Sequence, residues 1–123
     1  VIRSKAMNLQ EITKMQIEMD ERHGFPVHFT TEHERYQQLT KDLVGLFGEI
    51  GEFSNIVKKI NIKIDRPNDY QLEISEAETR LKEELVDSLI YIIRIGAILG
   101  IDLQAQVLEK IHLNESRYAQ LRR

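Results

Sequence analysis

The sequence contains no cysteine and no tryptophan, and only two prolines among 123 residues. Without cysteine the chain forms no disulfide and holds no metal through thiolates. It also lacks a run of about 18 uninterrupted apolar residues, the length that a membrane-spanning helix needs. The most apolar stretch, residues 85–101, is interrupted by Asp87, Ser88 and Arg94. The net charge of −3 gives no reason to expect a nucleic-acid binder, which typically carries a basic stripe. We therefore expect neither a membrane nor a nucleic acid as a partner.

The composition is that of one folded domain. Apolar residues make up 41% of the chain and charged residues 30%, which is typical of a globular protein. A chain of 123 residues supports one hydrophobic core, so we expect a single domain over residues 1–123. The first methionine is Met7, and residues 1–6 fit either a tag remnant or a processed end. No cleavable signal pattern opens the chain, so a cytoplasmic location is the default expectation.

Apolar residues recur at helical spacing in four segments, which predicts an all-α fold. The expected helices cover residues 2–22, residues 31 to about 60, residues 75 to about 99, and residues 103–120. Residues 61–64 alternate like a strand but are too short to compete with a helix. The sequence therefore predicts a four-helix bundle.

Capping and breaking residues predict where these helices begin and end. A Ser or Thr followed three residues later by Glu is a capping-box pattern, and it occurs at Thr31–Glu34 and Ser75–Glu78. Glycines favour helix C-termini, and a carboxylate can cap an N-terminus. The residues of this kind at the remaining boundaries are Gly24, Gly100 and Asp102.

The third helix is apolar on nearly all sides between residues 85 and 101. A helix without a polar face is buried on more than one side. Four helices of this size would cover it poorly, so we expect a second subunit to complete the bundle, in a homodimer or a homotetramer. The alternative is an unusually central helix within one chain.

Two acidic pairs border the apolar stripes of the second and third helices. Glu49 and Glu52 are three residues apart, as are Glu84 and Asp87, so each pair projects from one helix face. Antiparallel packing would bring the pairs together, and four neighbouring anions require positive charge. Carboxylate oxygens suit Mg²⁺, or Mn²⁺ in its place, better than Zn²⁺. For any single acid, a solvated charge on a helix surface is the simpler interpretation, least so for Asp87.

Gly48 and Gly51 alternate with the acids of the first pair. Glycine inside a helix costs about 1 kcal/mol relative to alanine, so two of them so close together call for a reason. They either leave room for a metal, water and phosphate, or allow close contact with another helix.

These motifs together resemble the acidic signature of the MazG-like, all-α nucleotide pyrophosphohydrolase superfamily. Residues 46–53 (LFGEIGEF) are similar to the first motif of that superfamily, and residues 83–91 (EELVDSLIY) to the second. The resemblance covers residues 31–120. Gly48, where many members carry Glu, is shared with a branch that resembles dCTP pyrophosphatases, whereas the interval 53–83 is longer than in the bacterial MazG branch. The likeness to the closing helix of the superfamily rests on residues 100–103, Lys110, Asn114, Arg117 and Tyr118.

The resemblance implies hydrolysis of a nucleoside or deoxynucleoside triphosphate between its α and β phosphates. The products would be a monophosphate and pyrophosphate, in the house-cleaning of nucleotide pools. The four acids would hold one or two Mg²⁺ ions, and Glu49, or else Glu52, would accept the proton of the attacking water. The residues expected to bind the phosphates and the sugar are Lys59, Tyr91, Lys110, Asn114, Arg117 and Tyr118.

Other interpretations of the sequence remain open. The loop after Gly24 carries Phe25 and Phe29, which either stack on a nucleobase or pack against the end of the bundle. A related enzyme would act on a phosphoribosyl nucleotide of histidine biosynthesis. A ferritin-like di-metal bundle would need two Glu-x-x-His motifs, and only residues 109–112 supply one. A non-enzymatic helical dimerisation module would use the acids only as surface charges.

Overall fold

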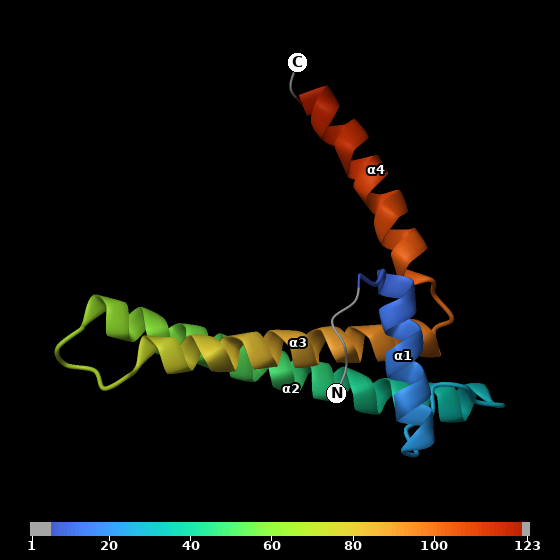
Figure 1. Cartoon of the computed structure of the whole chain (residues 1–123), viewed down its shortest axis with the longest axis horizontal. Helices are drawn as coiled ribbons and strands as arrows, with labels where there is room; N and C mark the ends of the chain where they lie inside the picture. Colours follow the sequence, from blue (N-terminus) through green and yellow to red (C-terminus); the bar gives the residue numbers. More distant parts are fainter. Residues whose placement is uncertain (1–5, 122–123) are drawn as a thin grey trace.

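The computed structural model describes residues 6–121, which form four helices and, within that range, no strand (Figure 1). The all-α prediction is confirmed. Residues 1–5 of the proposed tag or processed end lie outside the described part. The helices are α1 (Leu9–Arg22), α2 (Glu32–Asp65), α3 (Ile74–Ile98) and α4 (Leu103–Leu121).

The N-terminus of α1 lies later in the chain than expected, because Asn8 caps it. The Asn8 side chain accepts a hydrogen bond from Glu11 N at 2.8 Å, and the Glu11 carboxylate accepts one from Asn8 N at 3.4 Å. A short polar side chain satisfies helix N–H groups best from a position just before the helix. Ala6 was predicted to be helical, and it lies outside the helix. The remaining residues of the predicted start, 2–5, lie outside the described part.

The boundaries of α2 and α3 follow the predictions only in part. The Thr31 hydroxyl accepts a hydrogen bond from Glu34 N at 3.2 Å and caps α2 as expected, but α2 continues to Asp65 instead of ending near residue 60. The prediction that Ser75 caps α3 was wrong. Glu73 occupies the N-cap position without a side-chain hydrogen bond, and Ser75 lies inside the first turn.

The turn between α3 and α4 has the predicted chemistry. Gly100 adopts a φ of +71°, a conformation that glycine accepts without strain, and Ile101 N donates to Gly96 O at 2.9 Å. The Asp102 carboxylate then accepts a hydrogen bond from Ala105 N at 3.1 Å and caps α4.

The helices α2 and α3 form a long antiparallel hairpin, as expected, and α1 packs across its open end (Figure 1). From the same end, α4 extends away from the hairpin and contacts mainly α1. The buried apolar residues within residues 6–121 are few: Val27, Ile56, Ala77, Ile93 and Ile98. None of the helices within residues 6–121 is both long enough and apolar enough to cross a bilayer.

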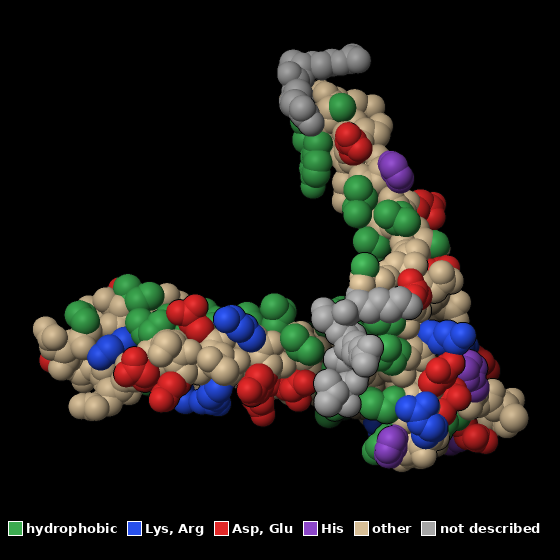
Figure 2. All heavy atoms as spheres, viewed as in Figure 1, with side chains coloured by type: hydrophobic (Ala, Val, Ile, Leu, Met, Phe, Trp, Pro, Cys, Tyr) green, Lys and Arg blue, Asp and Glu red, His purple; other side chains and the backbone are tan. Residues whose placement is uncertain are grey.

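Large apolar side chains remain exposed on the hairpin and on α4, as Figure 2 shows for one face of the molecule. Phe47 on α2 is 63% exposed and Leu85 on α3 is 60% exposed. α3 is therefore not buried on all sides within one chain, which argues against the alternative of a central helix. Further exposed apolar residues are Leu43, Val44, Ile50, Val86, Leu89 and Ile92 on the hairpin, and Val107, Leu108, Ile111 and Leu113 on α4.

Candidate metal centre and adjoining cleft

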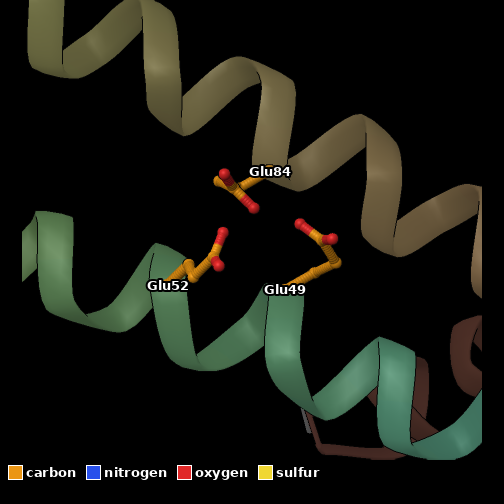
Figure 3. A group of neighbouring side chains, drawn as sticks. All are labelled: Glu49, Glu52 and Glu84. Atoms are coloured by element: carbon orange, nitrogen blue, oxygen red, sulfur yellow. The ribbon is translucent and has the colours of Figure 1, made fainter.

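The antiparallel register of α2 and α3 brings three of the four predicted acids together. Glu49, Glu52 and Glu84 each offer one carboxylate oxygen, and these oxygens all lie within 4.8 Å of one another. Figure 3 shows the three side chains pointing toward one another in the space between the helices. Asp87 lies one turn beyond Glu84, outside this group of three, and instead lines a cleft together with Glu49. We call Glu49, Glu52 and Glu84 the acidic cluster.

The acidic cluster is electrostatically strained because like charges crowd together. The hydrogen bond with Glu84 and the negative charge of Glu84 raise the pKa of Glu52, which the nearby Arg80 opposes. The hydrogen bond with Glu49 and then partial burial raise the pKa of Glu84. Carboxylates can bond to each other only when a proton lies between them. A shared proton or a bound cation would relieve this repulsion.

One oxygen of the acidic cluster points to a cation as its natural partner. Glu84 Oε2 is buried and, among residues 6–121, has no hydrogen-bond partner. A buried carboxylate oxygen without a donor is costly. A divalent cation would satisfy it together with the oxygens of Glu49 and Glu52, and an all-carboxylate set matches the preference of Mg²⁺ and Mn²⁺.

A cleft of about 650 Å³ adjoins the acidic cluster and runs between α1, α2 and α3. This volume lies within the range of small-molecule sites, about 300–1,000 Å³. Glu49 and Asp87 line the end next to the cluster, and Arg94, two turns further along α3, lines the other. The remaining lining residues are Gln16, Asp20, Gly24, Phe25, Gln38, Lys41, Asp42, Ile90 and Tyr91.

A buried ion network, which the sequence alone did not predict, forms the far end of this cleft. Arg94 donates to Asp20 Oδ2 at 2.9 Å and to Asp42 Oδ1 at 3.1 Å, which ties α3 to α1 and α2. Burial alone would lower the pKa of Arg94, but the two carboxylates outweigh burial and raise it. Arg94 also donates to the carbonyl oxygens of Phe25 and Pro26 at 3.1 and 3.4 Å. The sequence did contain a signal for this network, because Arg94 interrupts the most apolar stretch of the chain.

The close helix contact in this region occurs at Gly45, not at Gly48 or Gly51. A Cβ atom at Gly45 would lie 2.6 Å from the Tyr91 hydroxyl oxygen, so the ring of Tyr91 packs directly on the α2 backbone. At Gly48 and Gly51 a Cβ atom would meet nothing within 4 Å among the described residues. Among the described residues, those two glycines therefore face open space and make no close contact with another helix.

The other predicted substrate-binding residues lie apart from the acidic cluster. Tyr91 lines the cleft, and Lys59 is half-buried on α2, seven residues beyond Glu52 toward the tip of the hairpin. Those on α4 lie on the helix that extends away from the hairpin, so one chain does not bring them to the cluster (Figure 1). They are Lys110, Asn114, Arg117 and Tyr118.

The aromatic loop after α1 is divided between the core and the cleft. Val27 is fully buried and Phe29 half-buried, as expected of a loop that packs on the end of the bundle. Phe25, in contrast, is 58% exposed and lines the cleft. Phe25 therefore offers an accessible aromatic face beside the Arg94 network.

The fold and the site together define an all-α protein with carboxylates gathered between two antiparallel helices. No family model matches the chain. It is similar over 85 residues to dCTP pyrophosphatase 1 of Homo sapiens, at 33% identity, of Mus musculus, at 32%, and of Rattus norvegicus, at 31%. The matched region is 69% of this chain and 48% of each relative, so the chain spans about half the length of these curated relatives. The similarity supports the predicted resemblance, and membership of the MazG-like superfamily stays a prediction.

Proposed function

We propose that this chain is a metal-dependent nucleotide pyrophosphohydrolase that cleaves a nucleoside or deoxynucleoside triphosphate between the α and β phosphates. The observation that carries the proposal is the convergence of Glu49, Glu52 and Glu84 within 4.8 Å, with a buried, unpartnered oxygen on Glu84. The names of the relatives, dCTP pyrophosphatase 1, favour the same chemistry. The reaction would remove unwanted triphosphates from the nucleotide pool, a house-cleaning role.

Each acid has a proposed role. Glu49, Glu52 and Glu84 would hold Mg²⁺, or Mn²⁺, and Asp87 would complete the site from the edge of the cleft. The bound cation would neutralise the phosphates and lower the pKa of the attacking water. Glu49, or else Glu52, accepts the proton of that water, because a carboxylate not fully engaged by a cation remains a base. Tyr91 contacts the sugar, and Lys59 reaches the outer phosphates from α2.

We further propose that the working form is a homodimer or a homotetramer. The apolar side chains exposed on the hairpin and on α4 form a surface of the kind that subunits cover. In such an assembly, α4 of one subunit would lie beside the acidic cluster of another. That arrangement would supply the phosphates with the polar residues that one chain leaves apart: Lys110, Asn114, Arg117 and Tyr118.

An assay of product identity tests the enzymatic proposal. A panel of canonical and modified triphosphates is incubated with Mg²⁺, and pyrophosphate and orthophosphate are measured separately. We expect pyrophosphate, and we expect Glu52→Gln or Asp87→Asn to abolish its release while the helical circular dichroism spectrum stays unchanged. Glu78→Gln, at an exposed position of α3, the helix that carries Asp87, serves as the matched control and should retain activity. Orthophosphate as the first product would contradict the assigned bond, and no hydrolysis across the panel would contradict the function.

Mixing two inactive variants tests the shared site. Asp87→Asn inactivates the acidic site of one variant, and Arg117→Ala removes the contribution of α4 in the other. If α4 acts on a partner's site, mixed dimers contain one intact site, and about a quarter of wild-type activity returns for random pairing in a two-fold dimer. If α4 serves its own chain, mixing restores nothing. Light scattering of the wild-type protein gives the number of subunits independently.

A further inference from the structure

The helix α1 and its flanking caps, residues 8–25, lie across the open end of the hairpin and form one wall of the cleft (Figure 1). The turn after α1 is tied to the helix, because Phe25 N donates to Asp20 O at 2.8 Å. We call residues 8–25 the strap. Four of its residues line the cleft, namely Gln16, Asp20, Gly24 and Phe25. A movement of the strap would therefore open or narrow the cleft.

Arg94 on α3 makes the polar connection between the strap and the hairpin. It donates to Asp20 Oδ2 at 2.9 Å and to Phe25 O at 3.1 Å. Within residues 6–121, no other hydrogen bond joins the strap to α2 or α3. The two further bonds that leave the strap are exposed, and they join Gln10 to Gln104 on α4 and Glu21 to His28 in the loop. One buried arginine therefore supplies the hydrogen bonds that hold the strap on the hairpin.

The apolar packing of the strap is limited. Of residues 9–22, which form α1, Asp20 alone is buried, and it is charged. The large apolar side chains that α1 exposes, at 43%, 42% and 41%, are those of Ile12, Met15 and Met19. Val27, two residues beyond the strap, is in contrast fully buried. The chain is therefore fixed at Val27 and held by few contacts before it, which makes Pro26, between the two, the pivot about which the strap can turn.

The charges of the buried network favour release of the strap. Asp20 and Asp42 share one guanidinium, so the network carries one more negative charge than positive. Asp42 Oδ2 is buried and, among the described residues, has no hydrogen-bond partner. When the strap lifts, Asp20 enters water, and Arg94 keeps Asp42 as a balanced pair. Opening the strap therefore costs far less than breaking the whole network, because no charge is left buried alone.

We propose that the strap opens and closes over the cleft and that Arg94 holds it closed. In the closed form Arg94 binds both Asp20 and Asp42. In the open form it binds Asp42 alone, and the strap has turned about Pro26. The open form admits and releases the molecules that the cleft holds. The motion is independent of the reaction at the acidic cluster, so it does not rest on the proposed function.

Hydrogen exchange of the backbone amides tests the proposal on the ligand-free protein. A released helix of 14 residues is marginally stable in water, so the amides of α1 exchange when the strap opens. In the wild-type protein they should exchange faster than the amides near Ile93 in α3, because opening requires less free energy than unfolding. Equal protection of α1 and α3 would overturn the proposal, and this comparison needs no variant.

The same substitution at the two carboxylates should have opposite effects on α1. Asp20→Ala removes the acceptor from the strap and leaves Arg94 paired with Asp42, so α1 should exchange about 10-fold faster. Asp42→Ala leaves Arg94 without a carboxylate in the open form, so α1 should exchange at least about threefold more slowly. Asp69→Ala, at an exposed position in the turn between α2 and α3, should leave the exchange unchanged. Exchange of α1 that Asp42→Ala fails to slow would show that the network only stabilises the fold, and would overturn the proposal.

Access to the cleft is measured with a single thiol. The chain has no cysteine, so Ile90→Cys places one reactive group on the lining of the cleft. With a bulky maleimide, the labelling rate should rise when Asp20→Ala is added and fall when Asp42→Ala is added. A labelling rate that neither substitution changes would show that the strap does not control the cleft. Both measurements are made without nucleotide, so their outcome does not depend on whether the chain hydrolyses triphosphates.

Discussion

Replacement of Arg94 by methionine should destabilise the protein severely, because it leaves two carboxylates buried without their cation. The Arg94 side chain is 7% exposed, and those of Asp20 and Asp42 are 10% and 7% exposed. Methionine keeps most of the apolar volume of arginine, so the lost interactions are chiefly electrostatic. Breaking a buried ion pair by removing one partner costs about 3–5 kcal/mol in the free energy of unfolding. For a chain of this size, that corresponds to a fall in Tm of roughly 10–20 °C.

Thermal unfolding followed by circular dichroism, at one fixed protein concentration, measures this effect. Lys82→Met, at an exposed position of the same helix, is the control and should change the stability by less than about 0.5 kcal/mol. Combining Arg94→Met with Asp20→Asn and Asp42→Asn should restore much of the loss, because neutral amides are far less costly to bury than unpaired charges. A loss below about 1 kcal/mol for Arg94→Met alone would refute the buried network. No recovery in the triple variant would refute the electrostatic explanation.

Two further predictions concern the acidic cluster and its flank. The pKa of Glu84 in the folded chain lies above its usual value of 4.5, so the folded state binds more protons than the unfolded state. The stability of the metal-free protein therefore falls as the pH rises through this raised pKa. Glu84→Gln mimics the protonated form, so it should raise the metal-free Tm at pH 7. It should also abolish the increase in Tm that Mg²⁺ gives the wild-type protein. A variant whose Tm still rises with Mg²⁺ would contradict the metal site. Gly45→Ala should displace Tyr91 and lower the rate of pyrophosphate release, whereas Gly48→Ala, which meets no atom, should raise stability by about 1 kcal/mol. Unchanged rates in Gly45→Ala would show that the Tyr91 contact does not position the site.

Local chemistry explains why the helices were predictable and why some boundaries were not. The spacing of apolar residues is a property of each segment, and so is the capping of α2 by Thr31 and of α4 by Asp102. Ser75 fits the capping pattern equally well, but the helix begins at Ile74, one residue before it. Pattern alone cannot choose between adjacent start points, because each differs by only about one hydrogen bond.

The acidic pairs were likewise readable from the sequence, because residues three apart always share a helix face. That the pairs lie on opposite helices of one hairpin followed from the polar connection between them. The membership of the cluster did not follow. Glu49, Glu52 and Glu84 meet, while Asp87 lies along the cleft, because the exact register of α2 against α3 decides which oxygens converge.

The sequence by itself determined the helical class of this protein and the acidic pairs, since both depend on interactions within a few residues along the chain. Only the tertiary structure decided that Arg94 joins Asp42, 52 positions away, and Asp20, 74 positions away. It also decided that Tyr91 packs on Gly45 and that α4 leaves the hairpin. Contacts of this kind depend on how whole helices pack, and many alternative packings satisfy the same local pattern.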